Sequence, residues 1–103
     1  MISKKVNGEK AVLFFESEFT IHEVKEVREI IKEIESKKVN KIVFDLSKVK
    51  YIDSSAIGLL VTVLKYTKKN EGYLKLYNPT DEIKRILKLV NLSSFFETVN
   101  TIE

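Results

Sequence analysis

A short polar group interrupts the apolar pattern at residues 51–60, which read YIDSSAIGLL. Asp53, Ser54 and Ser55 come directly before an apolar run that has the composition of a buried helix. A side-chain oxygen at this place can cap the helix by accepting a hydrogen bond from a free backbone N–H, and Asp53 or Ser54 is the predicted cap. Capping needs only one side chain, so a hydroxyl remains for other chemistry, and the positive end of a helix is favourable for a phosphate. The two interpretations, a helix cap and a phosphorylation switch, are compatible.

The rest of the sequence offers little that could support catalysis. A serine nucleophile needs a neighbouring base, and His22 is the one histidine. The chain has no cysteine, so metal sites of the usual nitrogen and sulfur ligands cannot be built. The three glycines form neither a phosphate-binding loop nor a dinucleotide fingerprint. We therefore predict a binding or regulatory module that is not an enzyme and has no catalytic residue, cofactor or metal.

Length and composition predict a single soluble domain spanning residues 1–103. No window of the chain approaches the roughly 18 consecutive apolar residues of a membrane span. The 18 basic and 15 acidic residues are interleaved, which is typical of solvated helix faces rather than of a nucleic-acid-binding stripe. The N-terminal residues lack the apolar core of a secretion signal. We expect a cytoplasmic protein with no membrane span and no nucleic-acid partner, as a monomer or weak dimer.

The hydrophobic period predicts that the chain opens with a hairpin and a helix. Segments 2–6 and 11–16 have β character and are joined by residues 7–10, whose Asn-Gly pair favours a tight turn. Between residues 21 and 37 apolar side chains recur every three or four positions, as in an amphipathic helix. Thr20 and Glu23 have the spacing of a capping box at its start.

The second part of the chain predicts alternating strands and helices. Successive apolar residues at 41–46 indicate a central strand covered on both faces. After a loop at 47–52, the predicted elements are a helix at 54–70 ending in lysines and Gly72, a strand at 73–77, a helix at 82–90 and a strand at 96–99. This order predicts an α/β fold with a mixed, mainly parallel sheet, built from the N-terminal hairpin and βαβ units with helices packed against it.

Two predictions concern packing. Most of seven aromatic residues lie in predicted strands, where we expect core packing rather than stacking on nucleic-acid bases; the seven are Phe14, Phe15, Phe44, Tyr73, Tyr77, Phe95 and Phe96. Gly58 lies inside a predicted helix, where glycine costs about 1 kcal/mol relative to alanine. This cost predicts that another backbone approaches Gly58 closely, and internal packing is favoured over a partner.

Residues 42–58 resemble a known protein family. The strand IVFDLS at 42–47, the pair Tyr51-Ile52 and the hexapeptide DSSAIG at 53–58 are similar to the STAS domain of bacterial anti-sigma factor antagonists. Members of that family join such a strand through a short loop to Asp-Ser-Ser or Asp-Ser-Thr, followed by a small residue, an aliphatic residue and a glycine. The resemblance extends over nearly the whole chain and implies a STAS fold.

The resemblance also implies a partner-switching function. The unphosphorylated antagonist of this family binds an anti-sigma factor that is also a serine kinase, which releases the sigma factor. Phosphorylation of the second serine of the motif ends this binding, and a phosphatase of the PP2C type reverses it. The implied phosphorylation site is Ser55, and the implied partner-binding residues are Asp53, Ser54, Ser55, Ala56, Ile57 and Gly58.

A phosphate on Ser55 would add a charge of about −1.5 to −2 beside Asp53. It could therefore end binding at the interface alone, without unfolding the domain. Transfer from a kinase requires an accessible hydroxyl, so we expect Ser55 to be exposed at the protein surface.

Two features differ from the family pattern. Many members carry Gly-x-Leu-Asp after the second strand, where this chain has Ser17-Glu18-Phe19-Thr20, so the identity of the partner stays open. Many relatives also add a helix after the last strand, and its absence would leave apolar surface for another subunit. The alternative functions are a stand-alone STAS subunit of a lipid-transport ABC complex and, with no motif in its favour, a nucleotide-binding STAS protein.

Overall fold

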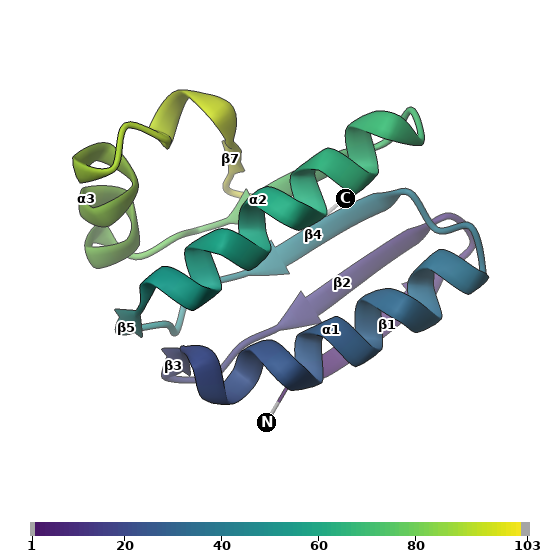
Figure 1. Cartoon of the computed structure of the whole chain (residues 1–103), viewed down its shortest axis with the longest axis horizontal. Coiled ribbons are helices and arrows are strands. Elements are labelled where there is room, and N and C mark those ends of the chain that lie inside the picture. Colours follow the sequence, from purple (N-terminus) through teal and green to yellow (C-terminus); the bar gives the residue numbers. More distant parts are fainter. Residues whose placement is uncertain (1, 102–103) are drawn as a thin grey trace.

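Two long helices lie on one face of a five-stranded sheet in the computed structural model, which describes residues 2–101 (Figure 1). The predicted α/β class, with a mixed and mainly parallel sheet, is confirmed. The sheet has the order β1-β2-β4-β6-β7, made of β1 (Ser3–Asn7), β2 (Lys10–Phe14), β4 (Lys41–Asp45), β6 (Tyr73–Tyr77) and β7 (Glu97–Val99). The helices are α1 (Ile21–Ser36), α2 (Ser54–Lys69) and α3 (Asp81–Leu89).

Strand pairing explains why the long helices share one face. β1 and β2 form the predicted antiparallel hairpin, with Gly8 at φ 63° in its turn. The other neighbours are parallel, so that Lys41 of β4 lies opposite both Lys10 and Tyr73. Each crossover advances in the same direction across the sheet, and right-handed crossovers of this kind place their helices on the same side. No helix within residues 2–101 is both long and apolar enough to cross a bilayer.

The core fills the space between this sheet face and α1 and α2. α1 contributes its predicted apolar stripe, Val24, Val27, Ile31 and Ile34. The strands contribute alternate residues, which are Ala11, Leu13, Ile42, Phe44, Leu74 and Leu76. Thr20 caps α1 through a complete capping box with Glu23, as predicted.

The opposite sheet face carries no helix of the described chain, which corrects a prediction about the aromatic residues (Figure 1). Burial on both faces of the central strand β4 is nevertheless confirmed, since Val43 is only 1% exposed although it lies outside the core cluster. Phe14, Tyr73 and Tyr77 lie outside the core cluster and are half-buried, and Phe95 is 56% exposed. Their predicted core packing is therefore wrong, because a strand pattern does not reveal which face a layer covers.

Each of the three helices ends in a Schellman motif that uses a residue other than glycine. Lys38, Glu71 and Asn91 adopt left-handed φ values of 58°, 60° and 61°. In α2 the Glu71 N–H donates to Lys68 O at 3.3 Å, and the Gly72 N–H donates to Thr67 O at 2.7 Å. The left-handed residue is thus Glu71 and not Gly72. Gly72 is required for another reason, since a Cβ there would lie 1.8 Å from Asn40 O.

Tyr66 fixes α2 to the connection between α1 and β4. Its hydroxyl donates to the Val39 carbonyl oxygen at 2.6 Å. Burial and the nearby Glu35 raise the pKa of Tyr66 above its ordinary value, so the phenol keeps the proton that it donates.

Candidate functional site

Asp53 is the N-cap of α2 and confirms the predicted capping of this helix. Its backbone is extended, with φ −116° and ψ 179°. Its Oδ1 accepts the Ala56 N–H at 3.0 Å, and its carbonyl accepts the Ile57 N–H at 3.1 Å. One carboxylate oxygen therefore satisfies the cap, and neither serine is needed for it.

The second oxygen of Asp53 makes a contact that the sequence did not predict. Oδ2 accepts the backbone N–H of Ile21, the first residue of α1, at 2.9 Å. The same carboxylate thus binds N–H groups from the first turns of α1 and α2. Negative charge is favourable at each of these helix ends, because their unpaired N–H groups carry partial positive charge.

A second, two-stranded sheet brings these helix starts together. β3 (Glu18–Phe19) and β5 (Tyr51–Ile52) pair in parallel, with Glu18 opposite Tyr51 and Phe19 opposite Ile52. Residues 51–52 were predicted as loop, which is wrong, because strands of two residues are too short to show a hydrophobic period. Phe19 anchors this sheet in the core, where its ring centroid is 4.5 Å from that of Phe15.

The two serines differ in exposure. Ser54 is exposed, and Ser55 is half-buried, so the predicted exposure of Ser55 is met only in part. Within residues 2–101 neither hydroxyl makes a hydrogen bond, and the side-chain cap of this helix is the Asp53 carboxylate, which accepts the Ala56 N–H. The Ser55 hydroxyl is therefore chemically unengaged beside a capped helix end.

The next three residues of the motif have different roles in the structure. Ala56 is fully buried and belongs to the core, whereas Ile57 is half-buried at its edge. Gly58 is exposed, and a Cβ built there would have no atom within 4 Å outside its own helix turn. The prediction of close internal packing at Gly58 is therefore wrong, and the open space is accessible to a partner.

Two exposed apolar residues flank this helix start and were missed from the sequence. Ile21 and Tyr51 are 59% and 57% exposed. The Ile21 N–H binds Asp53, and Tyr51 lies in β5 immediately before the motif. We name Ile21, Tyr51, Ser54, Ser55 and Gly58 the helix-start surface. Exposed large apolar residues around small polar groups are typical of a protein-binding surface.

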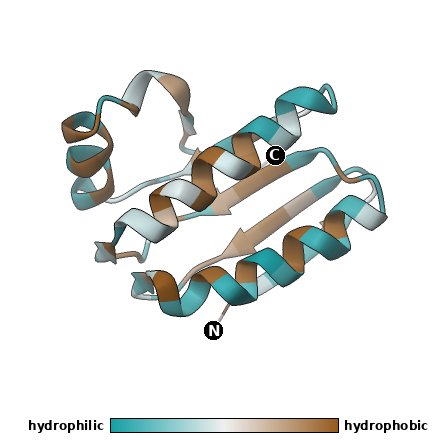
Figure 2. Cartoon of the chain, in the orientation of Figure 1, coloured by the Kyte–Doolittle hydropathy of each residue, from teal (hydrophilic) through white to brown (hydrophobic). Residues whose placement is uncertain are grey.

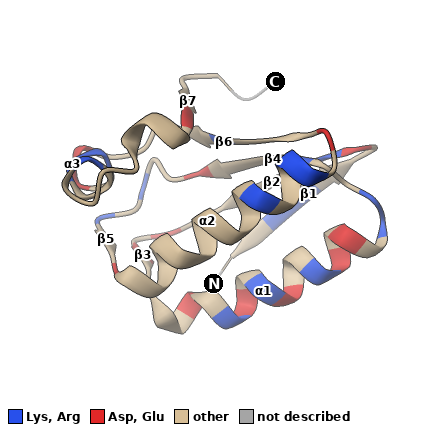
Figure 3. Cartoon of the chain, turned by 45° about the horizontal axis from the view of Figure 1, so that its top comes forward, with Lys and Arg blue, Asp and Glu red and all other residues tan. Residues whose placement is uncertain are grey.

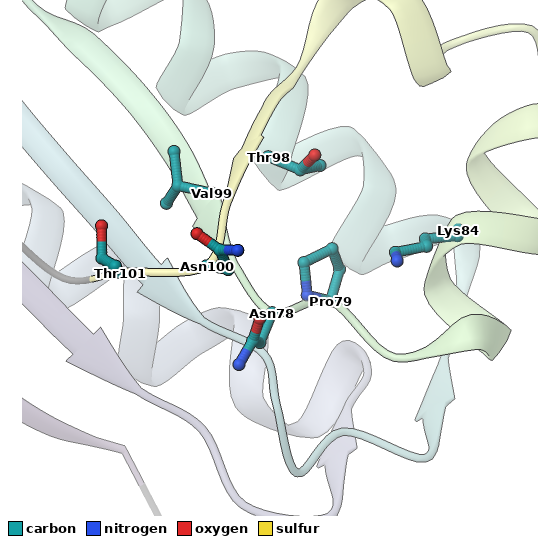
Figure 4. A pocket seen from close by; sticks show the side chains of 7 residues that line it. All are labelled: Asn78, Pro79, Lys84, Thr98, Val99, Asn100 and Thr101. Carbon is teal, nitrogen blue, oxygen red and sulfur yellow. The ribbon is translucent and has the colours of Figure 1, made fainter.

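Two polar hollows lie elsewhere in the described chain, and the larger, of about 510 Å³, is lined by Glu35, Lys38, Asn40, Tyr66, Lys69 and Asn70. Within residues 2–101, no three side chains of His, Asp or Glu come together as metal ligands. The smaller hollow, of about 410 Å³, lies beside the ends of β6 and β7, between Asn78, Lys84 and Asn100 (Figure 4). Lys84 is the one charged residue among its lining side chains, so the hollow contains no acid–base pair.

A comparison of the sequence with known protein families finds a match. The STAS domain model matches residues 1–103. The chain belongs to the STAS domain family. The predicted family is thereby confirmed.

Similar sequences carry the names of anti-sigma factor antagonists. A candidate anti-sigma factor antagonist of Thermotoga maritima is 31% identical over 102 residues, which cover 99% of this STAS chain and 80% of the relative. The anti-sigma-B factor antagonist of Listeria monocytogenes is 25% identical over 88 residues, covering 85% of this chain and 77% of that protein.

Solved structures share the fold. The crystal structure of an anti-sigma factor antagonist candidate from Thermotoga maritima has a TM-score of 0.88 at 27% identity, covering 98% of this chain and 87% of that one. The unphosphorylated form of SpoIIAA has a TM-score of 0.84 at 20% identity, covering 97% and 89% of the two chains. At this lower identity the likeness to SpoIIAA concerns the fold alone.

Proposed function

We propose that this STAS domain is an anti-sigma factor antagonist that is controlled by phosphorylation of Ser55. The unphosphorylated form binds an anti-sigma factor that is also a serine kinase, and this binding releases the sigma factor. The kinase then phosphorylates Ser55 and ends the complex, and a phosphatase of the PP2C type restores the binding form. Asp53, Ser54, Ser55, Ala56, Ile57 and Gly58 form the contact segment, with Ala56 supporting it from the core.

The observation that carries this proposal is that Asp53 makes the hydrogen bonds at the helix starts, whereas the Ser55 hydroxyl makes none in the described chain. Asp53 alone accepts hydrogen bonds from both helix starts, at 2.9 Å from Ile21 N and 3.0 Å from Ala56 N. The Ser55 hydroxyl has no hydrogen-bond partner in the described chain, although it lies in the first turn of α2. A serine that the fold does not use is available for modification.

The expected effect of a phosphate follows from its charge. A phosphoserine carries about −1.5 to −2 at neutral pH, and here it would lie near the carboxylate of Asp53. The helix dipole offsets part of this repulsion within the domain, by about 0.3 to 1 kcal/mol. A partner surface that fits a neutral hydroxyl at Ser55 would have to desolvate the phosphate, so binding is lost while the domain stays folded.

The names of the sequence relatives support the antagonist function, since two of them are described as anti-sigma factor antagonists. The fold also accommodates a phosphate in at least one structure. SpoIIAA in its phosphorylated form has a TM-score of 0.78 to this chain at 20% identity.

The test is a binding and phosphorylation experiment on the isolated partner. Immobilised wild-type chain captures proteins from native extract, and each captured ATPase is purified and titrated with four chains: wild type, Ser55→Ala, Ser55→Asp and the matched control Ser54→Ala. We expect an ATPase of the histidine-kinase-like fold and at least tenfold weaker binding of Ser55→Asp, which is about 1.4 kcal/mol. Ser55→Ala should bind but accept no phosphate, whereas Ser54→Ala should bind and be phosphorylated.

Intact mass and fragment spectra after incubation with ATP locate the phosphate. A phosphate on a residue other than Ser55, or equal affinity of the phosphorylated and unphosphorylated chains, would refute the switch. Recovery of an ABC ATPase that never phosphorylates the chain would support the alternative of a transporter subunit.

A further inference from the structure

An apolar groove runs along α2 on the side that faces away from α1. It has a volume of about 240 Å³ and lies between Val61, Leu64, Lys65 and Lys68 of α2 and the segment that contains Leu92, Phe95 and Phe96. The opposite flank of α2 faces α1 through Leu59, Thr62, Val63 and Tyr66. We name this hollow the α2–η1 groove, after the short 3-10 helix η1 (Ser93–Phe95) that forms its outer wall.

Exposed apolar side chains occur in the groove wall and in the chain segment that leads to it. Leu89, Val90 and Phe95 are exposed, and Phe95 is 56% exposed although its ring lines the groove. Figure 2 shows hydrophobic stretches along α2 and in the neighbouring α3–η1 segment. Large apolar side chains that gather at one place on a domain mark an interaction surface more often than single exposed ones do.

The charges at the groove are all positive. Its two charged lining residues are Lys65 and Lys68, and neither forms an ion pair with a carboxylate in residues 2–101. α2 itself contains no acidic residue. Figure 3 shows that the first half of α2 is uncharged and that its lysines lie in the second half. A complementary occupant is therefore apolar on one side and acidic beside it.

The backbone around the groove restricts the secondary structure of the occupant. The α2 wall has its N–H and C=O groups paired within the helix, so it cannot extend an incoming strand by main-chain hydrogen bonds. An occupant must then satisfy its own backbone, which a helix does. We infer that the α2–η1 groove binds an amphipathic helix of a partner protein, with apolar residues against Val61, Leu64 and Phe95 and acidic residues against Lys65 and Lys68.

This inference does not depend on phosphorylation of Ser55. Val61 follows Ile57 and Gly58 by one turn of α2, so the groove continues the helix-start surface along the same helix. A partner could therefore contact both surfaces, and each can be tested without the other.

The test uses synthetic peptides and the whole chain. The probe is a fluorescently labelled amphipathic peptide of about 18 residues, with leucines on one face and glutamates on the other. The matched peptide has lysine at every glutamate position. We expect the acidic peptide to bind, the basic peptide to bind at least tenfold more weakly, and the double variant Lys65→Glu/Lys68→Glu to reverse this preference.

Two further variants distinguish binding in the groove from nonspecific attraction of the peptide to the charge of the chain. Phe95→Ser should weaken binding of the acidic peptide at least tenfold and leave the circular dichroism unchanged, because Phe95 is largely exposed. Lys25→Glu makes the same substitution once on the exposed side of α1, away from the groove, and should leave the affinity unchanged. Backbone amide chemical shifts should change at Val61, Leu64 and Phe95.

Four results would overturn the inference. These are no binding of the acidic peptide at about 1 mM, equal binding of both peptides, shift changes confined to other surfaces, and full affinity of Phe95→Ser. Two other occupants are tested in parallel. Sedimentation with phosphatidylglycerol vesicles that is lost in Phe95→Ser would assign the groove to a lipid surface, and a dimer in ultracentrifugation that is lost in Phe95→Ser would assign it to a second copy of the chain.

Discussion

The Asp53 carboxylate accepts the backbone N–H of Ile21 at 2.9 Å, although 32 residues separate the two in sequence. Its other oxygen caps α2 through Ala56 N. A single side chain therefore links the first turns of α1 and α2, which the β3–β5 pairing brings together. The serines of the motif and the exposed Ile21 and Tyr51 are held around it, and the stability of this arrangement can be measured.

Replacement of Asp53 should destabilise the fold through both contacts. We expect Asp53→Ala to lower the free energy of unfolding by about 2 kcal/mol, since loss of a cap alone costs about 0.5 to 2 kcal/mol and the Ile21 contact is lost as well. Asp53→Ser keeps one capping oxygen and should be intermediate. Urea unfolding followed by circular dichroism measures both, with Ser54→Ala as the control. A Ser variant as stable as wild type would show that the Ile21 contact contributes nothing.

Ser55 should be dispensable for stability. Its hydroxyl makes no hydrogen bond in the described chain, so Ser55→Ala should change the free energy of unfolding by less than about 0.5 kcal/mol. The same urea experiment checks this. A loss comparable to that of Asp53→Ala would mean that Ser55 itself caps α2, and the argument for an unused hydroxyl would then fail.

Substitution of Gly58 should affect the stability of the domain and its affinity for a partner in opposite directions. A Cβ at this position meets open space, so Gly58→Ala should stabilise the isolated domain by about 1 kcal/mol. If a partner approaches the helix here, the same variant should bind that partner more weakly, which titration measures. Gly72→Ala is the contrasting control and should destabilise strongly, because its Cβ would lie 1.8 Å from Asn40 O. Unchanged or lower stability of Gly58→Ala would contradict the open space.

Glycine should stabilise the fold at the residues with left-handed backbone that end α1 and α2. Lys38 and Glu71 have φ values of 58° and 60°, which side chains disfavour. Lys38→Gly and Glu71→Gly should each raise the free energy of unfolding by up to about 1 kcal/mol. Lys25→Gly, in the middle of α1, should instead lower it by about 1 kcal/mol. Thermal and urea unfolding of the three variants test the sign in each case.

Local motifs were the part of this protein that the sequence predicted well. The cap at Asp53 and the capping box of Thr20 and Glu23 depend on residues close in the chain, so their spacing is visible in the sequence. The fold class follows from the order of strands and helices, which limits the topology to parallel units with right-handed crossovers.

Contacts between distant segments were the part that could not be predicted. The Asp53–Ile21 hydrogen bond needs the β3–β5 pairing, and two-residue strands leave no periodic signal. Likewise, Phe14 and Phe15 are identical in type and adjacent in sequence, but only Phe15 faces the core. Which side of a strand is covered depends on where the helices cross, and residue types alone do not contain that information.

The strand order also determines how the chain must close on itself during folding. Only β1 and β2 are joined by a tight turn, whereas β2 pairs with β4, and β4 with β6, across a complete intervening helix. Closing these long loops costs conformational entropy before the parallel strand pairs can form their stabilising contacts. We therefore expect the assembly of β4 between its two neighbours to limit the folding rate. In stopped-flow refolding, Val43→Ala in β4 should therefore slow folding, whereas Val99→Ala in the edge strand β7 should mainly accelerate unfolding.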